Sequence, residues 1–260
     1  MPFDVQELSY CFDTQKVVDS ISIKMNSGLF YGILGPNGSG KTTFLDLLSR
    51  HKQATSGQIF YKGEKLGNYS RKGLSREIAL VPQNYYINFP FTALEVVLMG
   101  RYPHMPKFAA PSDYDLQMVE KAMQTTGTLQ FKDRLISELS GGERQRVVFA
   151  RALAQDTPVL MLDEATSNLD IKFALHVLQV AAEQNGQGQA DNKTIISVFQ
   201  DINLAAAFCD YLVFMREGQI ATHGPAKEVL SNETLKQVFD VEAKVYFEPY
   251  SNSKHVVFKK

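Results

Sequence analysis

The sequence has few of the features that mark secreted, membrane-spanning or metal-binding proteins. It contains only two cysteines, Cys11 and Cys209, and their spacing does not suit a metal site, so we expect free thiols in a reducing compartment. No apolar run approaches the roughly 18 residues of a membrane-spanning helix. Residues 1–7 contain the acidic Asp4 and Glu7 and no apolar core, so they do not resemble a secretory signal. These absences predict a soluble cytoplasmic protein.

An excess of charge of either sign is also absent. The chain has 27 Lys and Arg against 28 Asp and Glu, which gives a formal net charge of −1 at pH 7. Such a protein has no global field that attracts nucleic acid or anionic lipid, so we expect no nucleic-acid partner, and any membrane contact must be local. Its 260 residues, 44% of them hydrophobic, are enough to bury a substantial core.

The strongest pattern that is present lies in residues 33–48. Apolar residues 30–34 suit a short buried strand, the glycines that follow end it, and Phe44 begins an amphipathic helix. Between strand and helix, the spacing Gly-x4-Gly-Lys-Thr forms a complete Walker A motif. The predicted phosphate contacts come from Gly35, Pro36, Asn37, Gly38, Ser39, Gly40, Lys41, Thr42 and Thr43.

Each part of this motif has a chemical role. The glycines let backbone N–H groups approach a phosphate and form an anion nest at a helix N-terminus. Lys41 adds a positive charge for the β- and γ-phosphates, and the Thr42 hydroxyl can ligate Mg²⁺. The motif therefore predicts a nucleotide site, but it leaves open what work the nucleotide drives.

Polar residues also end two other predicted strands. Residues 159–162 are apolar and lead into Asp163 and Glu164, a Walker B pattern. Asp163 can hold the Mg²⁺ shell, and Glu164 can orient and deprotonate a water in line with the γ-phosphate. Gln83 follows the predicted strand 78–82, and its amide oxygen can reach Mg²⁺ or the attacking water.

A second anion site is predicted at residues 139–147. Ser140 suits a helix N-cap, and Glu143 stands at the capping-box position three residues later. With Gly141 and Gly142, Ser140 forms a nest at the start of a helix that is predicted to run to Ala154. Because the chain has two phosphate sites and one nucleotide motif, we expect the second site to serve another subunit.

Taken together, the patterns predict an α/β fold. We expect a P-loop NTPase core with a mixed sheet, an N-terminal antiparallel β-subdomain and an inserted helical subdomain. The single domain is predicted to divide into a nucleotide-binding core at 1–84 and 156–224, a helical subdomain at 85–155 and a C-terminal extension at 225–260. In the extension we expect a short helix at 226–230 and a strand-prone tail.

Three further expectations concern loops and aromatic residues. Residues 101–111, rich in proline and aromatics, predict an exposed loop, and the polar residues 185–192 predict a surface connection. Phe12 is our first candidate to stack on a purine and Tyr10 the second, although a lone aromatic in a strand is more often a core residue.

The motifs and their order resemble the ATP-binding cassette family. They are Walker A, Gln83 at a strand end, Leu-Ser-Gly-Gly-Glu from residue 139, Walker B, and Ser-Asn-Leu-Asp at 167–170. The resemblance implies ATP and Mg²⁺ as cofactors. It also implies that two copies pack head to tail, with each ATP between Walker A of one chain and Ser140, Gly141 and Gly142 of the other. Asp170 would link the two sites across that interface.

More narrowly, residues 97–104, 200–205 and 228–241 resemble ATPase subunits of bacterial importers for ferric siderophores, haem and cobalamin. This resemblance implies a peripheral subunit at the cytoplasmic face of the cell membrane. Its partners would be integral-membrane permease subunits and, indirectly, a periplasmic or surface substrate-binding protein. The region after Gln83 would contact the permease's cytoplasmic coupling helix and convert closure of the nucleotide dimer into opening of the transport path.

One residue departs from the family pattern. Where the family usually has a switch histidine, in His-Asp-Leu-Asn, this chain has Gln200. Glutamine can donate an amide hydrogen bond to the γ-phosphate, but it cannot relay a proton as imidazole can. We therefore predict that ATP binding is intact and that hydrolysis is slowed.

Two alternatives to a normal transport ATPase stay open on the sequence. The first is a soluble cassette that acts as a slow switch in assembly, repair or regulation, and Gln200 favours it slightly. The second is a natural or engineered variant of an importer subunit that is held partly inactive.

Overall fold

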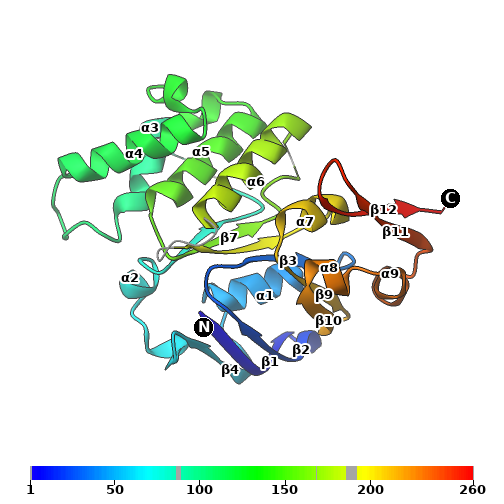
Figure 1. Ribbon diagram of the computed structural model, residues 1–260. Coiled ribbons are helices and arrows are strands. Elements are labelled where there is room, and N and C mark those ends of the chain that lie inside the picture. The colour runs from blue at the N-terminus through cyan, green and yellow to red at the C-terminus, as the bar shows by residue number, and fades with distance from the viewer. Residues whose placement is uncertain (1, 86–88, 168, 186–191, 260) are drawn as a thin grey trace. The chain divides into compact units, whose positions relative to one another are not determined.

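The computed structural model describes residues 2–85, 89–167, 169–185 and 192–259, and Figure 1 shows its helices and strands. By the contacts within it, the chain divides into two compact units. The first unit comprises residues 1–69 and 185–260, and the second comprises residues 70–184. The second unit thus contains the predicted helical subdomain, 85–155, together with strands on either side of it in sequence; the finer three-part division stays a prediction.

The first unit begins with the expected antiparallel sheet. Its strand order is β2-β1-β4-β5, and every pairing is antiparallel. Apolar side chains of β1 such as Phe3 and Leu8 are fully buried, because one face of the sheet packs on the core. The strands are β1 (Phe3–Phe12), β2 (Gln15–Met25), β4 (Ser56–Tyr61) and β5 (Glu64–Lys65), followed by the 3₁₀ helix η1 (Leu66–Asn68).

A second set of strands in this unit has the order β10-β9-β3-β8. β3 (Phe30–Leu34) is parallel to β8 (Thr194–Val198) and to β9 (Tyr211–Arg216), whereas β10 (Gln219–Pro225) is antiparallel to β9. All residues of β3 and β8 are buried, as continuous apolar runs predict for central strands of a parallel sheet. The helix after β3 is α1 (Lys41–Leu48), and the helix after β8 is α7 (Ile202–Phe208).

The C-terminal extension contains more helix than the sequence analysis predicted. The expected short helix is α8 (Ala226–Val229), and the strand-prone tail is the hairpin of β11 (Ala243–Glu248) and β12 (Ser253–Phe258). Between them lies α9 (Asn232–Phe239), which we did not predict. Ser231 caps α9 by accepting a hydrogen bond from Thr234 N, and Leu235 and Val238 are its buried residues.

The second unit combines two parallel strands with a helical layer. β6 (Ile78–Val81) pairs in parallel with β7 (Val159–Asp163). In Figure 1 the helices α3, α4 and α5 lie close together, coloured green to cyan. The helices are α2 (Arg71–Leu74), α3 (Ala93–Leu98), α4 (Asp113–Thr125), α5 (Gly141–Ala154) and α6 (Ile171–Asn185), with the 3₁₀ helices η2 (Met99–Arg101), η3 (Leu129–Phe131) and η4 (Ile136–Glu138).

The helical layer has its own apolar core. Val97 of α3, Met123 of α4 and Val147 of α5 are fully buried in one cluster, which matches the i, i+3, i+4 spacing of apolar residues in these segments. Burial of this face, more than intrinsic helix propensity, holds such short helices in place.

The predicted exposed loop at 101–111 is wrong in its first part. Arg101 is only 3% exposed, because its Nε pairs with Asp115 Oδ1 at 2.9 Å and its Nη1 donates to Ala154 O at 2.8 Å. Met105 is also buried, and the exposed residues of this segment are Tyr102 and residues 106–110. A buried ion pair between residues 14 apart in sequence leaves no local pattern that would reveal it.

The predicted surface connection at 185–192 has its residues 186–191 outside the described part of the chain. Among the described residues, no helix combines the length and the apolarity that crossing a membrane requires.

Candidate nucleotide-binding site

The phosphate loop, residues 35–40, adopts a shape that only glycine permits at two positions. A Cβ atom on Gly35 would lie 2.1 Å from Met215 O, so the loop packs directly on the end of β9. Gly40 has φ 94° and caps α1, and a Cβ there would lie 2.6 Å from Val17 O. Both substitutions would force the backbone apart, which explains why the motif needs glycine here.

Lys41 is buried within this loop. Its side chain is 5% exposed, and Nζ donates to Gly35 O and to Pro36 O at 2.9 Å each. Ser39 is also buried, and its Oγ has no hydrogen-bond partner among the described residues. Thr42 and Thr43 follow in the first turn of α1, half-buried. The loop thus presents a cation and hydroxyl groups at a helix N-terminus, as an anion site requires.

The predicted Walker B acids lie at the end of a completely buried strand: Asp163 is the last residue of β7, and Glu164 follows it. Asp163 is 5% exposed and Glu164 is 7% exposed. Glu164 has φ 48°, a left-handed conformation that is unusual for a residue other than glycine and that costs energy. Its carbonyl oxygen accepts hydrogen bonds from Ser167 N at 3.0 Å and Ser167 Oγ at 2.9 Å, which hold the backbone in this conformation.

The structure brings Gln83 and Glu164 together, because they follow the neighbouring parallel strands β6 and β7. Gln83 Nε2 donates to Glu164 Oε2 at 2.6 Å. This bond fixes the orientation of the carboxylate and leaves the Gln83 Oε1 oxygen as a possible ligand. The sequence analysis gave both residues a part in handling water or Mg²⁺, and it did not foresee the direct bond between them.

Ser140, Gly141 and Gly142 begin α5 with the expected capping box. Ser140 Oγ accepts from Glu143 N at 3.4 Å, and Glu143 Oε2 accepts from Ser140 N at 2.8 Å. The Ser140 backbone bond, followed by its hydroxyl, lowers the pKa of the Glu143 carboxyl, so the acid stays charged. Ser140 and Gly141 are exposed, whereas residues 147–150 are buried, so this helix end is open to a partner.

Asp170 lies just before α6, and its Oδ1 accepts from Phe173 N at 3.0 Å, so it helps to cap that helix. Asn168, the second residue of the Ser-Asn-Leu-Asp motif, lies outside the described residues.

Phe12 and Gln200 are both exposed. Phe12, at the end of β1, is 64% exposed, so it is not a core residue and its ring is accessible for stacking. Gln200 follows β8 and precedes Asp201, whose Oδ1 caps α7 by accepting from Asn203 N at 2.8 Å and Leu204 N at 3.1 Å. Tyr10 is half-buried and lies under Lys52, with Nζ 6.0 Å from the ring centroid.

The predicted site residues are divided between the two units. The first unit contains the phosphate loop, Phe12 and Gln200, and the second contains Gln83, Asp163, Glu164, the Ser140 helix end and Asp170. The proposed Mg²⁺ ligands are a hydroxyl, an amide oxygen and a carboxylate, from Thr42, Gln83 and Asp163. These hard oxygen donors fit the preference of Mg²⁺. In the described residues no cluster of three or more His, Cys, Asp or Glu side chains suits a different metal.

Sequence reasoning missed two residues that support the phosphate loop. Gly218 N donates to Ser39 O at 3.2 Å, and Gly218 O accepts from Asp19 N at 2.8 Å, so the turn after β9 supports the loop from behind. Nothing in the local sequence Glu217-Gly218 indicates which loop this turn contacts.

Comparison with known proteins gives a consistent result. Residues 18–167 match the family model described as ABC transporter. The chain is 36% identical to the cobalamin import ATP-binding protein BtuD of Halobacterium salinarum over 96% of its length, although it spans only 61% of that relative. It is 34% identical to the iron(3+)-hydroxamate import ATP-binding protein FhuC of Bacillus subtilis, over 95% of this chain and 91% of that one.

Among solved structures, the fold is similar to that of a chain from a transporter assigned to the metal-chelate type and solved in an inward-facing conformation. The TM-score is 0.83 at 26% identity, and the match covers 100% of this chain and 97% of the other. The mixed α/β architecture with its antiparallel N-terminal sheet is therefore confirmed by a match over the whole chain.

Proposed function

Because this chain belongs to the ABC transporter family, we propose that it is the ATP-binding and ATP-hydrolysing subunit of a membrane importer. Its relatives import cobalamin and ferric hydroxamates, so the proposed cargo is a ferric siderophore, haem or cobalamin. The subunit would act at the cytoplasmic face of the membrane, with permease subunits and, indirectly, a substrate-binding protein as partners.

The observation that carries this proposal is the bond from Gln83 Nε2 to Glu164 Oε2 at 2.6 Å. Glu164 is the proposed base, and a fixed carboxylate at a strand end can accept the proton of a water that attacks the γ-phosphate. Lys41 and the loop N–H groups would stabilise the charge on the phosphates, and Phe12 would stack on the purine of ATP. When bound by Thr42, Gln83 and Asp163, Mg²⁺ would neutralise further charge on the β- and γ-phosphates.

A second copy would complete each site. The helix end at Ser140, Gly141 and Gly142, of which the first two are exposed, is an anion site in a unit that does not contain the phosphate loop. We assign it to the γ-phosphate of an ATP bound to the phosphate loop of the partner copy, with Asp170 at the interface. ATP binding would thus close a dimer, and hydrolysis would open it.

The second unit also offers a groove for a permease. The groove has a volume of about 390 Å³. The residues that line it include Lys72, Met99, Gly100, Tyr102, Pro103 and Arg151. Tyr102 is 57% exposed, so an aromatic side chain is available to a partner. Arg151 Nη1 donates to Tyr85 Oη at 2.6 Å, which connects the groove to the segment that begins at Gln83. A permease helix in this groove could therefore act on the catalytic glutamine.

The substitution Glu164→Gln tests the enzymatic part. We expect the variant to bind a fluorescent ATP analogue with wild-type affinity, and hydrolysis to fall by roughly 100-fold or more, since the amide cannot accept the proton. Because ATP then persists, size-exclusion chromatography with light scattering should show an ATP-dependent dimer. Rapid hydrolysis by Glu164→Gln would contradict the role of Glu164 as base.

Gln200 favours a second candidate, a cassette that acts as a slow ATP-driven switch outside transport. Purification of the tagged chain from membranes distinguishes the two. A transport subunit should copurify with a polytopic permease that raises its ATPase rate, whereas a stable complex with soluble proteins alone would support the switch.

A further inference from the structure

The C-terminal extension is connected to the phosphate loop through Arg216, the last residue of β9, and the turn that follows it. The Nη1 of Arg216 donates to Gln237 O in α9, and its Nε lies 3.4 Å from Glu217 Oε1 in the turn after β9. In that turn, Gly218 N donates a hydrogen bond to Ser39 O of the phosphate loop. Met215, the residue before Arg216, packs directly on Gly35. A continuous set of contacts therefore runs from α9 through Arg216 to the loop that is proposed to bind the phosphates.

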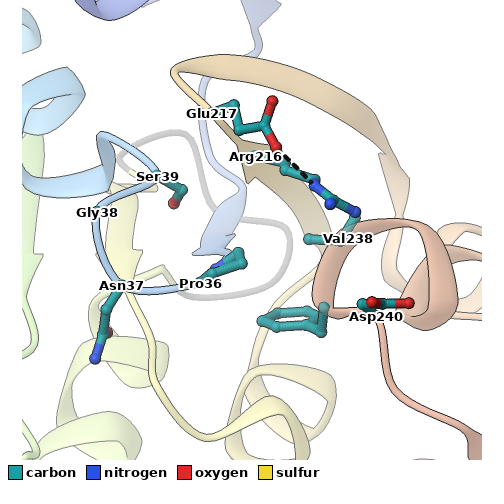
Figure 2. A pocket seen from close by; sticks show the side chains of 9 residues that line it. Pro36, Asn37, Gly38, Ser39, Arg216, Glu217, Val238 and Asp240 are labelled. Atoms are coloured by element: carbon teal, nitrogen blue, oxygen red, sulfur yellow. Dashed lines mark hydrogen bonds and ion pairs between the residues drawn. The ribbon is translucent and has the colours of Figure 1, made fainter. Parts of the chain in front are cut away.

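The same elements line an open pocket of about 260 Å³. In Figure 2, Pro36 and Ser39 of the phosphate loop lie on one side, and Arg216 and Val238 lie on the other. The side chains of α9 thus face the loop across this open pocket. Beside this pocket the loop is held by contacts from Met215 and Gly218, which lie next to Arg216 and two residues after it in the chain.

A second connection joins the extension to the turn at residues 199–201, here called the switch turn because it contains Gln200. Asn203 stands in the first turn of α7, directly after this turn. Its Nδ2 donates to Val256 O at 3.2 Å, and its Oδ1 accepts from Val256 N at 2.7 Å. Both polar backbone groups of one β12 residue are thus paired with one amide side chain, which fixes α7 to the hairpin.

The other strand of the hairpin has a comparable bond that does not reach the switch turn. Val245 N of β11 donates to Asn232 Oδ1 at 2.8 Å, and Asn232 belongs to α9. The chain therefore offers two asparagines that hold the same hairpin, of which only Asn203 is three residues from Gln200. Comparing substitutions at Asn203 and Asn232 therefore distinguishes a role of Asn203 in positioning the switch turn from a general loss of stability.

We propose that the C-terminal extension, residues 226–259, positions two parts of the nucleotide site through separate contacts. Arg216 sets the phosphate loop, and Asn203 sets the switch turn. Both act as positioning residues, because neither is placed against the nucleotide itself. The inference rests on the proposed function and adds to it a part for the segment that follows the sheet.

The test compares four variants of the full chain with the wild type: Asn203→Ala, Asn232→Ala, Arg216→Ala and Arg216→Lys. KM and kcat for MgATP and the Kd of a fluorescent ATP analogue are measured for each. Asn203→Ala should lower kcat about three- to tenfold with KM unchanged, since both hydrogen bonds to Val256 are lost. Asn232→Ala should leave both constants unchanged, although it should lower the melting temperature to a similar extent.

Arg216→Ala should raise the Kd and KM about three- to tenfold at constant kcat, and Arg216→Lys, which retains a donor, should recover most of the affinity. The inference is overturned if the two asparagine variants have equal kcat values, or if Arg216→Ala binds the analogue like the wild type. A wild-type chain that neither binds nor hydrolyses ATP would instead overturn the proposed function.

Discussion

At the scale of single residues, Glu164 is held in an uncommon backbone conformation while its carboxylate is fixed by Gln83. A φ of 48° costs energy, and it persists because Ser167 pairs twice with the Glu164 carbonyl. Glu164 is therefore a buried acid at the end of a strand, and both its backbone and its carboxylate are held in one orientation by hydrogen bonds. Such preorganisation is what a proposed base requires, since no reorientation is then needed during the reaction.

Gln200 gives a prediction about rate at the same scale. Gln200→His should raise the rate of ATP hydrolysis about tenfold or more, because imidazole can relay a proton that an amide cannot. The variant should also gain a pH dependence near the ordinary pKa of histidine, about 6.5. Steady-state phosphate release at several pH values measures both effects.

The matched control is Gln200→Ala, which removes the amide donor and should be slower than the wild type. If Gln200→His turns over ATP at the wild-type rate, the assignment of position 200 to the γ-phosphate is wrong.

At the scale of secondary structure, a buried ion pair connects η2 to α4. The side chains of Arg101 and Asp115 are 4% and 10% exposed, and their Nε and Oδ1 atoms are 2.9 Å apart. The Ser112 side chain first, and then Arg101, lower the pKa of the Asp115 carboxyl. The folded chain therefore holds this proton less tightly than the unfolded chain, so the pair contributes stability above about pH 4 and loses it as the pH falls toward the lowered pKa.

Asp115→Asn tests this pair. At pH 7 the variant should lose about 3 kcal/mol of unfolding free energy, because the Arg101 charge stays buried without its partner. Since the titrating group is gone, the difference from the wild type should shrink as the pH is lowered to about 4 and below. Urea unfolding at both pH values measures this. Asp113→Asn, an exposed acid in the same first turn, is the control, and an equal loss in both variants would contradict the prediction.

The helices show which elements could be predicted from the sequence and which could not. α5 was predicted to its last residue, because Ser140 and Glu143 form a capping box and the apolar period is clear. α9 was missed although Ser231 and the spacing of Leu235 and Val238 carry similar signals; its eight residues were taken as part of a strand-prone tail. The buried Arg101 was missed for a different reason, since its partner is distant in sequence.

The candidate site was predictable to the extent that its motifs are local. The phosphate loop, the Walker B acids and the helix end at Ser140 each follow from a few consecutive residues. The Gln83 to Glu164 bond, the support of Ser39 by Gly218 and the Asn203 contact with Val256 join residues that are 53 or more positions apart. Only tertiary structure brings such residues together.

At the scale of the whole molecule, the parts of the proposed site are divided between two units of one chain. The phosphate loop belongs to the first unit, and the exposed helix end at Ser140 belongs to the second. The proposal that each ATP contacts the loop of one copy and the helix end of another predicts that hydrolysis depends on pairing. Its rate per chain should therefore rise with protein concentration, until all chains are paired.

Mixing two inactive variants tests the shared site directly. Lys41→Ala removes the phosphate-binding charge, and Ser140→Arg blocks the helix end, so each variant alone should hydrolyse almost no ATP. In a mixed pair, the intact loop of the Ser140→Arg chain meets the intact helix end of the Lys41→Ala chain. Equal amounts should therefore recover up to about a quarter of the wild-type rate, since half of the pairs are mixed and each has one complete site. Full activity of Ser140→Arg alone, at any concentration, would show that a single chain hydrolyses ATP without the helix end of a partner.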